Sequence, residues 1–278
     1  MLKLLPLSLA ETQSLSPRHP YYPRRIDKVM FVGGYPRLFD KKLPPEEWLS
    51  GYYQTYVERD VRELLKIGDL DTFARFIRLC AARVGSLINL SSLASDAGVT
   101  QPTAKAWLSV LKTSFICFSL QPYFKNFNKR LTKQSKLYFY DTGLLCYLLN
   151  IKSPDELNTH ALRGAVFENW VLIELIKSRY NKGEEPGFYF WRDSHGSEVD
   201  VLWEEKSRLR LVEIKSSSTF HFEFLHGLDY LNKIGSQKEA GTLVYTGDKS
   251  FNAHGHKVCA WDEISSVLLK TSVLKSTT

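Results

Sequence analysis

Charged residues interrupt the apolar strand patterns in the second half of the chain. Asp200 lies between two valines in EVDVLW, where a strand rarely carries a charge. Glu213 and Lys215 lie on either side of Ile214 in LRLVEIK. Because side chains alternate along a strand, Glu213 and Lys215 share one face. Glu168 lies on an apolar helical stripe, where a carboxylate is costly unless it is paired or binds a cation.

These residue types are the ones that phosphodiester hydrolysis needs. A hard cation, Mg²⁺ or Mn²⁺, polarises the phosphate and binds water, and carboxylates from adjacent strands can hold it. A lysine beside one ligand can orient the water or stabilise developing negative charge. We therefore predict Asp200, Glu213 and Glu168 as metal ligands. Lys215 completes the predicted catalytic set.

Each part of this set has a less specific interpretation. The tripeptide E-x-K alone often marks a surface salt bridge on a strand. The combination with Asp200 on the preceding strand and Glu168 on the leading helix is much more specific. Glu198 shares the face of Asp200 and is an alternative ligand. His195 is an alternative catalytic group, although a loop histidine is more often solvated.

The order of elements around these residues predicts a mixed α/β domain at 157–278. We expect an αβββαβ core followed by a last helix. The expected segments are a helix at about 161–179, strands at 188–192, 198–203 and 208–215, a helix at about 222–234, a strand at 242–245 and a helix at 262–270. With the helical half before it, the overall class is α/β (α+β overall).

The first half of the chain predicts helices. Residues 1–45 are rich in Pro, Gly, Arg and Tyr and favour irregular connection with short helical pieces. Apolar residues then recur at spacings of three and four in 46–85. A short helix at 90–97 precedes a turn and a second helix, which Thr100 caps and Pro102 begins.

That spacing is typical of a helix-turn-helix, and we assign 46–150 to a helical plus winged-helix domain. The leading end of the second helix reaches base edges or phosphates in such modules, and here it carries Gln101, Thr103 and Lys105. FICFSL and KLYFYD could be wing strands. The basic residues expected beside the DNA backbone are Lys129, Arg130, Lys133 and Lys136. Winged helices also serve as protein-contact modules, and this alternative stays open.

Composition sets broad limits. The 278 residues carry a formal net charge of +7, which fits a phosphate-rich partner but also a solvated basic surface. The four cysteines are scattered without a CxxC pair, as expected for thiols in a reducing cytosol. No apolar run approaches the roughly 20 residues of a membrane helix. We expect a cytoplasmic protein with no membrane partner.

Several long runs carry a family resemblance. They are GGYPRL (33–38), YVERDVREL (56–64), INLSSLASDAGVTQPTAKAWLSVL (88–111), KLYFYDTGLLCYLL (136–149), RGAVFENWV (163–171), FYFWRDSHGSEVDVL (188–202) and VEIKS (212–216). In this order they resemble bacterial and archaeal AAA-type ATPases that carry a C-terminal restriction-endonuclease-like domain of uncharacterised function. The resemblance implies a PD-(D/E)xK nuclease-like fold for 157–278.

The chain departs from that family at its beginning. It contains no G-x-x-x-x-G-K-[ST], and GTLVYTGDKS (241–250) has the wrong spacing. It therefore resembles the C-terminal part of such a protein, with 1–45 as a remnant of motor, lid and connector and with no ATP site of its own.

Three functions remain as hypotheses. The first is a DNA-binding, Mg²⁺- or Mn²⁺-dependent nuclease. The second is a non-catalytic DNA- or protein-binding regulatory module. The third is an ATPase subunit whose motor is on another chain.

Overall fold

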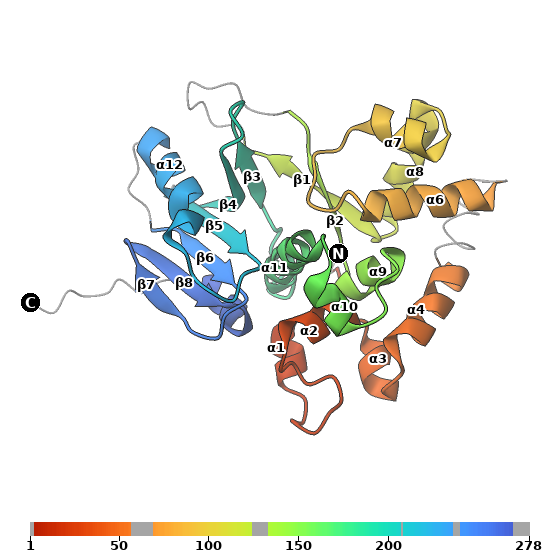
Figure 1. Ribbon diagram of the computed structural model, residues 1–278, viewed down its shortest axis with the longest axis horizontal. Helices are drawn as coiled ribbons and strands as arrows, with labels where there is room; N and C mark the ends of the chain where they lie inside the picture. The colour runs from red at the N-terminus through yellow and green to blue at the C-terminus, as the bar shows by residue number, and fades with distance from the viewer. Residues whose placement is uncertain (1–2, 57–68, 124–132, 207, 236–239, 269–278) are drawn as a thin grey trace, which may run out of the picture.

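The computed structural model describes residues 3–56, 69–123, 133–206, 208–235 and 240–268. In that part of the chain, helices pack on a mixed eight-stranded sheet (Figure 1). The strands are β1 (Cys117–Pro122), β2 (Lys136–Phe139), β3 (Tyr189–Arg192), β4 (Glu198–Glu205), β5 (Arg208–Lys215), β6 (Thr242–Tyr245), β7 (Phe251–Ala253) and β8 (His256–Ala260). The expected mixed class, α/β (α+β overall), is therefore confirmed.

Helices come from both halves of the chain. The α-helices are α1 (Leu9–Gln13), α2 (Ile26–Val32), α3 (Pro36–Lys41), α4 (Pro45–Tyr52), α6 (Leu70–Ala81), α7 (Leu90–Ala97), α8 (Gln101–Thr113), α9 (Thr142–Leu148), α10 (Pro154–Thr159), α11 (Arg163–Tyr180) and α12 (His226–Gly235). The 3₁₀-helices are η2 (Phe222–Leu225) and η3 (Trp261–Val267). None of the described helices is long and apolar enough to cross a membrane.

The strand directions bring many strand ends to one edge of the sheet. The order is β2-β1-β3-β4-β5-β6-β8-β7. β1 runs parallel to β3, and β5, β6 and β8 run parallel to one another. β2, β4 and β7 are antiparallel to their neighbours. The carboxyl ends of β1, β3, β5, β6 and β8 therefore share an edge with the amino ends of β2, β4 and β7. We call it the carboxyl edge.

The sheet is continuous across the two halves of the chain. β1 pairs with β3 through Gln121 and Pro122, opposite Tyr189 and Phe190. The segments expected as wing strands thus lie in the same sheet as β3, β4 and β5. One hydrophobic core also contains residues of both halves, among them Phe76 and Ile214.

Helices cover both faces of the sheet. α11 lies at the centre of the molecule and packs on the face formed by Val201, Val212 and Ile214 (Figure 1). α12 covers the other face, where Leu228 packs in a second core with Leu211. The apolar alternation of β5 accounts for this sandwich, because each face of the strand has its own helix.

The observed elements agree closely with expectation around α7, α8, β5 and β6, and differ at the C-terminal end. The helix expected at 262–270 is the 3₁₀-helix η3, and residues 269–270 lie outside the described residues. β7 and β8 have no counterpart among the expected strands. They are joined through His254 and Gly255, which have φ of 49° and 80°, and a His-Gly pair is a weak hairpin signal compared with Asn-Gly.

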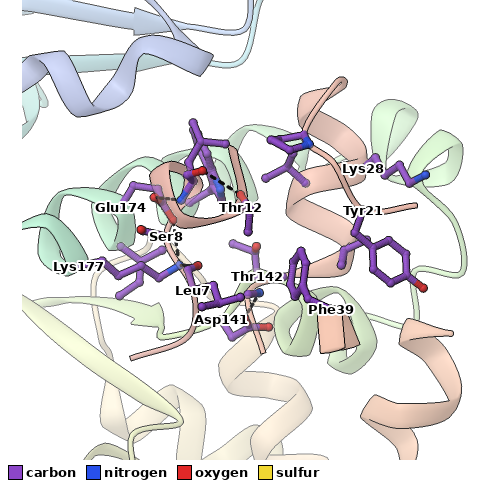
Figure 2. Close-up of a pocket in the computed structure, with 18 of the residues that line it drawn as sticks. Leu7, Ser8, Thr12, Tyr21, Lys28, Phe39, Asp141, Thr142, Glu174 and Lys177 are labelled. Carbon is purple, nitrogen blue, oxygen red and sulfur yellow. Dashed lines mark hydrogen bonds and ion pairs between the residues drawn. The ribbon is translucent and has the colours of Figure 1, made fainter. Parts of the chain in front are cut away.

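A buried ion pair on α11 holds the N-terminal segment in place (Figure 2). The Glu174 and Lys177 side chains are almost fully buried, and Lys177 Nζ lies 2.8 Å from Glu174 Oε1. Glu174 accepts a hydrogen bond from Leu9 N–H, and Lys177 donates one to the Leu7 carbonyl. The segment before α1 is therefore tied to the central helix by polar contacts within the core.

Lys177→Ala should lower the free energy of unfolding by about 3–5 kcal/mol, because it leaves the Glu174 carboxylate buried without its cation. Arg179→Ala, on the same helix, is the control. Arg179 pairs with the half-exposed Glu184, which lies beyond the end of α11, so its loss should change stability by roughly 1 kcal/mol or less. Urea unfolding of both variants measures the difference. An equal loss of unfolding free energy in the two variants would contradict a special role for the buried Glu174–Lys177 pair.

Candidate metal centre at the carboxyl edge

Three elements bring charged side chains together at the carboxyl edge. Glu168 lies on α11. β4 begins at Glu198 and places Asp200 two residues further, on the same side of the strand. β5 ends with Glu213 and Lys215. The carboxyl ends of strands in open α/β sheets commonly build ligand sites, and the residues predicted from the sequence lie at such an edge.

Three of these acids form a compact group. Carboxylate oxygens of Glu168, Glu198 and Asp200 all lie within 4.8 Å of one another. Carboxylates at this distance repel each other unless a proton or a cation compensates them. The group contains two of the predicted ligands, Glu168 and Asp200, together with the alternative ligand, Glu198. Its oxygen donors are those that Mg²⁺ and Mn²⁺ prefer.

Asp200 is buried, and it takes part in the backbone pairing of the sheet. Its Oδ2 accepts a hydrogen bond of 2.8 Å from Ile214 N–H, just beyond the Val201–Val212 pair of β4 and β5. The carboxylate thus replaces a backbone carbonyl where the ladder ends. Burial, followed by the charges of Glu213 and Glu168, raises the pKa of Asp200 well above its ordinary value.

Glu213 has one carboxylate oxygen without a partner. Its Oε1 accepts a hydrogen bond of 2.6 Å from Lys215 Nζ. Its Oε2 is buried and has no hydrogen-bond partner among the described residues. Burial raises the pKa of Glu213 to about 7, although Lys215 opposes this shift. A buried carboxylate oxygen with unused lone pairs fits a site that receives a cation or a proton.

Lys215 remains a cation in this surrounding. Burial alone would lower the pKa of its ammonium, but the charges of Glu213 and Asp200 outweigh burial and raise it. Its side chain is partly exposed, at 36%. Lys215 can therefore present a positive charge both to Glu213 and to a bound anion.

The prediction that Lys136 contacts the DNA backbone is corrected by the structure. Lys136 is only 3% exposed, although it begins the edge strand β2, because its ammonium lies against the acids of the cluster and over the Phe190 ring. Its Nζ lies 3.0 Å from Glu168 Oε1 and forms a second ion pair with Glu198. Lys136 therefore belongs to the carboxylate cluster, where its ammonium compensates two of the acids.

Two further residues complete this cluster. Tyr138 donates a hydrogen bond from its hydroxyl to Glu168, and Arg192 Nη1 lies 3.0 Å from Glu198 Oε2. The sequence pattern alone does not reveal these roles. The one signal for Lys136 is a lysine directly before the apolar run LYFY, and such a lysine is equally typical of a basic wing.

The other predicted site residues lie elsewhere. Gln101 and Lys105 are exposed on α8, whereas the Thr103 hydroxyl lies 2.8 Å from that of Thr100. Lys133 is exposed. Lys129 and Arg130 lie outside the described residues. DNA contact by Gln101, Thr103, Lys105, Lys129, Arg130 and Lys133 stays a prediction.

The alternative catalytic group His195 is exposed in the loop before β4. Its backbone N–H donates a hydrogen bond to Asp193 Oδ1. A catalytic role for His195 stays a prediction.

Two family models match the chain. Residues 23–155 match a model described as "Domain of unknown function (DUF8612)". Residues 163–264 match one described as "Domain of unknown function (DUF4143)". The second match contains α11, β4 and β5, and the first contains Lys136. The charged cluster is therefore built from both matched segments.

The chain is also similar to uncharacterised proteins. It is 32% identical over 195 residues to one from Mycobacterium tuberculosis and to one from Mycobacterium bovis, covering 69% of this chain and 43% of each relative. A protein of Haemophilus influenzae is 22% identical over 189 residues, covering 65% of this chain and 46% of its own length. The chain thus spans less than half the length of these relatives. No solved structure matches it.

The raised pKa of Glu213 predicts how stability depends on pH. Between its ordinary pKa of 4.5 and about 7, the folded protein keeps a proton that the unfolded chain has lost. Metal-free stability should therefore fall as pH rises through this window. Glu213→Gln cannot titrate, so its melting temperature relative to wild type should be higher at pH 8 than at pH 5, by about 5 °C. If, in EDTA, the melting temperatures of Glu213→Gln and wild type differ by the same amount at pH 5 and pH 8, the raised pKa of Glu213 is contradicted.

Lys136→Met should destabilise the metal-free protein by about 3–5 kcal/mol, because Glu168 and Glu198 lose their buried counter-charge. Mg²⁺ should restore part of the melting temperature, since a cation can take over the compensation. Thermal unfolding with and without excess Mg²⁺ measures both effects. Lys133→Met, at an exposed position on the same segment, is the control and should change little.

Proposed function

We propose that this chain is the DNA-binding, metal-dependent phosphodiesterase part of a larger protein, with a PD-(D/E)xK nuclease-like domain. One observation carries the proposal. Glu168, Asp200, Glu213 and Lys215, chosen from sequence, come together at one edge of the sheet, where a Glu213 oxygen is buried without a partner among the described residues. The order α11, β3, β4, β5, α12, β6 is also the expected αβββαβ order.

The donor set fits a hard divalent cation. Asp200 and Glu168 would hold it together with Glu198, and the buried oxygen of Glu213 would complete the site or hold a second ion. Mg²⁺ or Mn²⁺ bound there would supply charge to polarise the phosphate and a bound water as nucleophile.

The protein's own groups have separate tasks. Lys215 provides a cation beside Glu213 that can orient the attacking water or stabilise the negative charge developing on the phosphate. Tyr138 and Lys136 hold the Glu168 carboxylate in position. Arg192 and Lys136 do the same for Glu198.

DNA binding rests on the first half of the chain. α7 and α8 pack against each other, and α6 packs against α7. Thr100 caps α8 through Thr103 N–H as expected. β1 and β2 follow as an antiparallel pair, and an isolated bridge joins Leu87 to Lys136. This arrangement supports the winged-helix interpretation, with Gln101 and Lys105 exposed at the leading end of α8 for contact with DNA.

The non-catalytic alternative is favoured by a different observation. Lys136 already places an ammonium among the acids of the cluster, so the fold compensates these charges without a metal ion. In that case the cluster is a structural ion network, and the chain binds DNA or protein as a regulatory module. The resemblance to AAA-type ATPases and the partial coverage of longer relatives also leave open a motor on another chain.

Incubation with linear, supercoiled and branched DNA tests the two hypotheses. Wild type should cut in Mg²⁺ or Mn²⁺ and not in EDTA. Glu213→Ala and Lys215→Ala should each lower the cleavage rate by about 10²-fold or more, as expected for groups that act in the transition state.

Lys182→Ala is the matched control for Lys215→Ala, since it removes an exposed lysine beyond the end of α11 and should cleave like wild type. Binding of DNA with a steep salt dependence but without cleavage would support the non-catalytic alternative. Cleavage that survives both site substitutions would point to a contaminating nuclease.

A further inference from the structure

A cationic cleft lies next to the carboxylate cluster. It has a volume of about 500 Å³ and is lined by residues of the N-terminal segment, of α11 and of the loops that follow β5 and β6. The arginines are Arg24, Arg25 and Arg163, and the hydroxyl-bearing residues include Ser216, Ser218 and Thr246. Because Ser216 and Thr246 directly follow β5 and β6, the cleft opens at the carboxyl edge.

The lining has an excess of positive charge. Three arginines and a single acid, Asp27, line the cleft. Asp27 is committed to Arg163, with Oδ1 2.8 Å from Nε. The Arg25 side chain is 60% exposed and its partner Asp155 is 82% exposed, so solvent screens that pair and an anion can compete for the guanidinium.

Two further features favour an anion. α11, an 18-residue helix, begins in the cleft at Arg163 without a side-chain cap hydrogen bond, and the start of a helix carries partial positive charge. The Thr246 hydroxyl is buried with no hydrogen-bond partner among the described residues. Arginine forks, free hydroxyls and a helix start are the groups with which proteins bind phosphate.

The cleft and the cluster are close enough to share one ligand. Ser216 follows Lys215 directly, and a Cβ on Gly164 would lie 3.4 Å from Ser216 Oγ. Gly164, beside the cleft, and Glu168, in the cluster, are four residues apart on α11. Their positions are therefore separated by about 6 Å along the helix axis. A flexible phosphodiester chain that passes the cluster can therefore extend into the cleft.

We infer that this cleft binds a backbone phosphate of a nucleic-acid strand, next to the phosphate held at the carboxylate cluster. The inference rests on the proposed function, since it takes the ligand to be nucleic acid. It adds a positioning site at Arg24 and Arg25, in the segment 1–45 that we interpret from the sequence as a remnant of motor, lid and connector. Contacts of this kind fix the register of a strand without reading its bases.

The test measures binding of a fluorescent single-stranded oligonucleotide by anisotropy in EDTA, so that no cleavage is needed. Arg24→Gln/Arg25→Gln should weaken binding about tenfold and reduce the slope of log K against log salt by about 0.7 for each phosphate that the variant no longer neutralises. Arg25→Glu alone should weaken it as well, because it reverses the charge. Lys41→Gln/Lys42→Gln, which removes two exposed lysines beyond this cleft, should bind like wild type.

A methylphosphonate oligonucleotide of the same sequence separates phosphate contact from other effects. It has no backbone charge, so wild type and the double arginine variant should bind it equally weakly. Wild-type affinity and salt slope in the double arginine variant, with an unchanged melting temperature, would overturn the inference. Hydrolysis of bis(p-nitrophenyl) phosphate by wild type in Mn²⁺ tests the proposed function separately, because this small diester has no neighbouring phosphate.

Discussion

Several carboxylates meet at the carboxyl edge of the sheet. Burying them together costs free energy, and the surrounding residues have to offset this cost. Asp200 and Glu213 are each more than nine-tenths buried. Burial of an ionised carboxylate is unfavourable unless protons, cations or hydrogen bonds compensate it. Lys136 and Lys215 supply two of these compensations from β2 and β5. The raised pKa values of Asp200 and Glu213 indicate that the compensation is incomplete.

This constraint connects the two halves of the molecule. Lys136 comes from the strand pair that follows α8, while its acid partners lie on α11 and β4. The pairing of β1 with β3 makes these ion pairs possible, because it extends the sheet from the second half into the first. α8 packs on β1, which pairs with β2, so a continuous set of contacts joins the helices of the first half to Lys136. In the proposed function, these contacts join the DNA-binding helices to the cluster at the edge.

The predictable part of the structure is the part with strong local patterns. The alternation in LRLVEIK predicts β5 with its bounds, and the capping residue Thr100 predicts the start of α8. Glu168 and Asp200 each interrupt an apolar pattern in the sequence. Because a buried carboxylate needs a partner, this interruption predicts that the two side chains belong to a charged site, and they do lie close together.

The remaining features depend on contacts between distant segments. Nothing local in KLYFYD distinguishes a wing lysine from one buried among acids, because the pairing of β1 with β3 decides its surroundings. The same holds for Arg192, and for the cleft in which Arg24 and Arg25 meet residues that lie far away in the sequence. Short strands such as β7 and β8 gain their stability from their neighbours rather than from their own composition.

The central claim is that the cluster at the carboxyl edge is a divalent-cation site, and Mn²⁺ binding followed by electron paramagnetic resonance tests it most directly. Titration of wild type and of Asp200→Asn with Mn²⁺ at pH 8 separates free from bound ion. The account predicts saturable binding to wild type that Mg²⁺ displaces and that Asp200→Asn abolishes. Folded wild-type protein that binds no Mn²⁺, or equal binding by the variant, would contradict it and would leave the cluster as an ion network that Lys136 and Lys215 compensate.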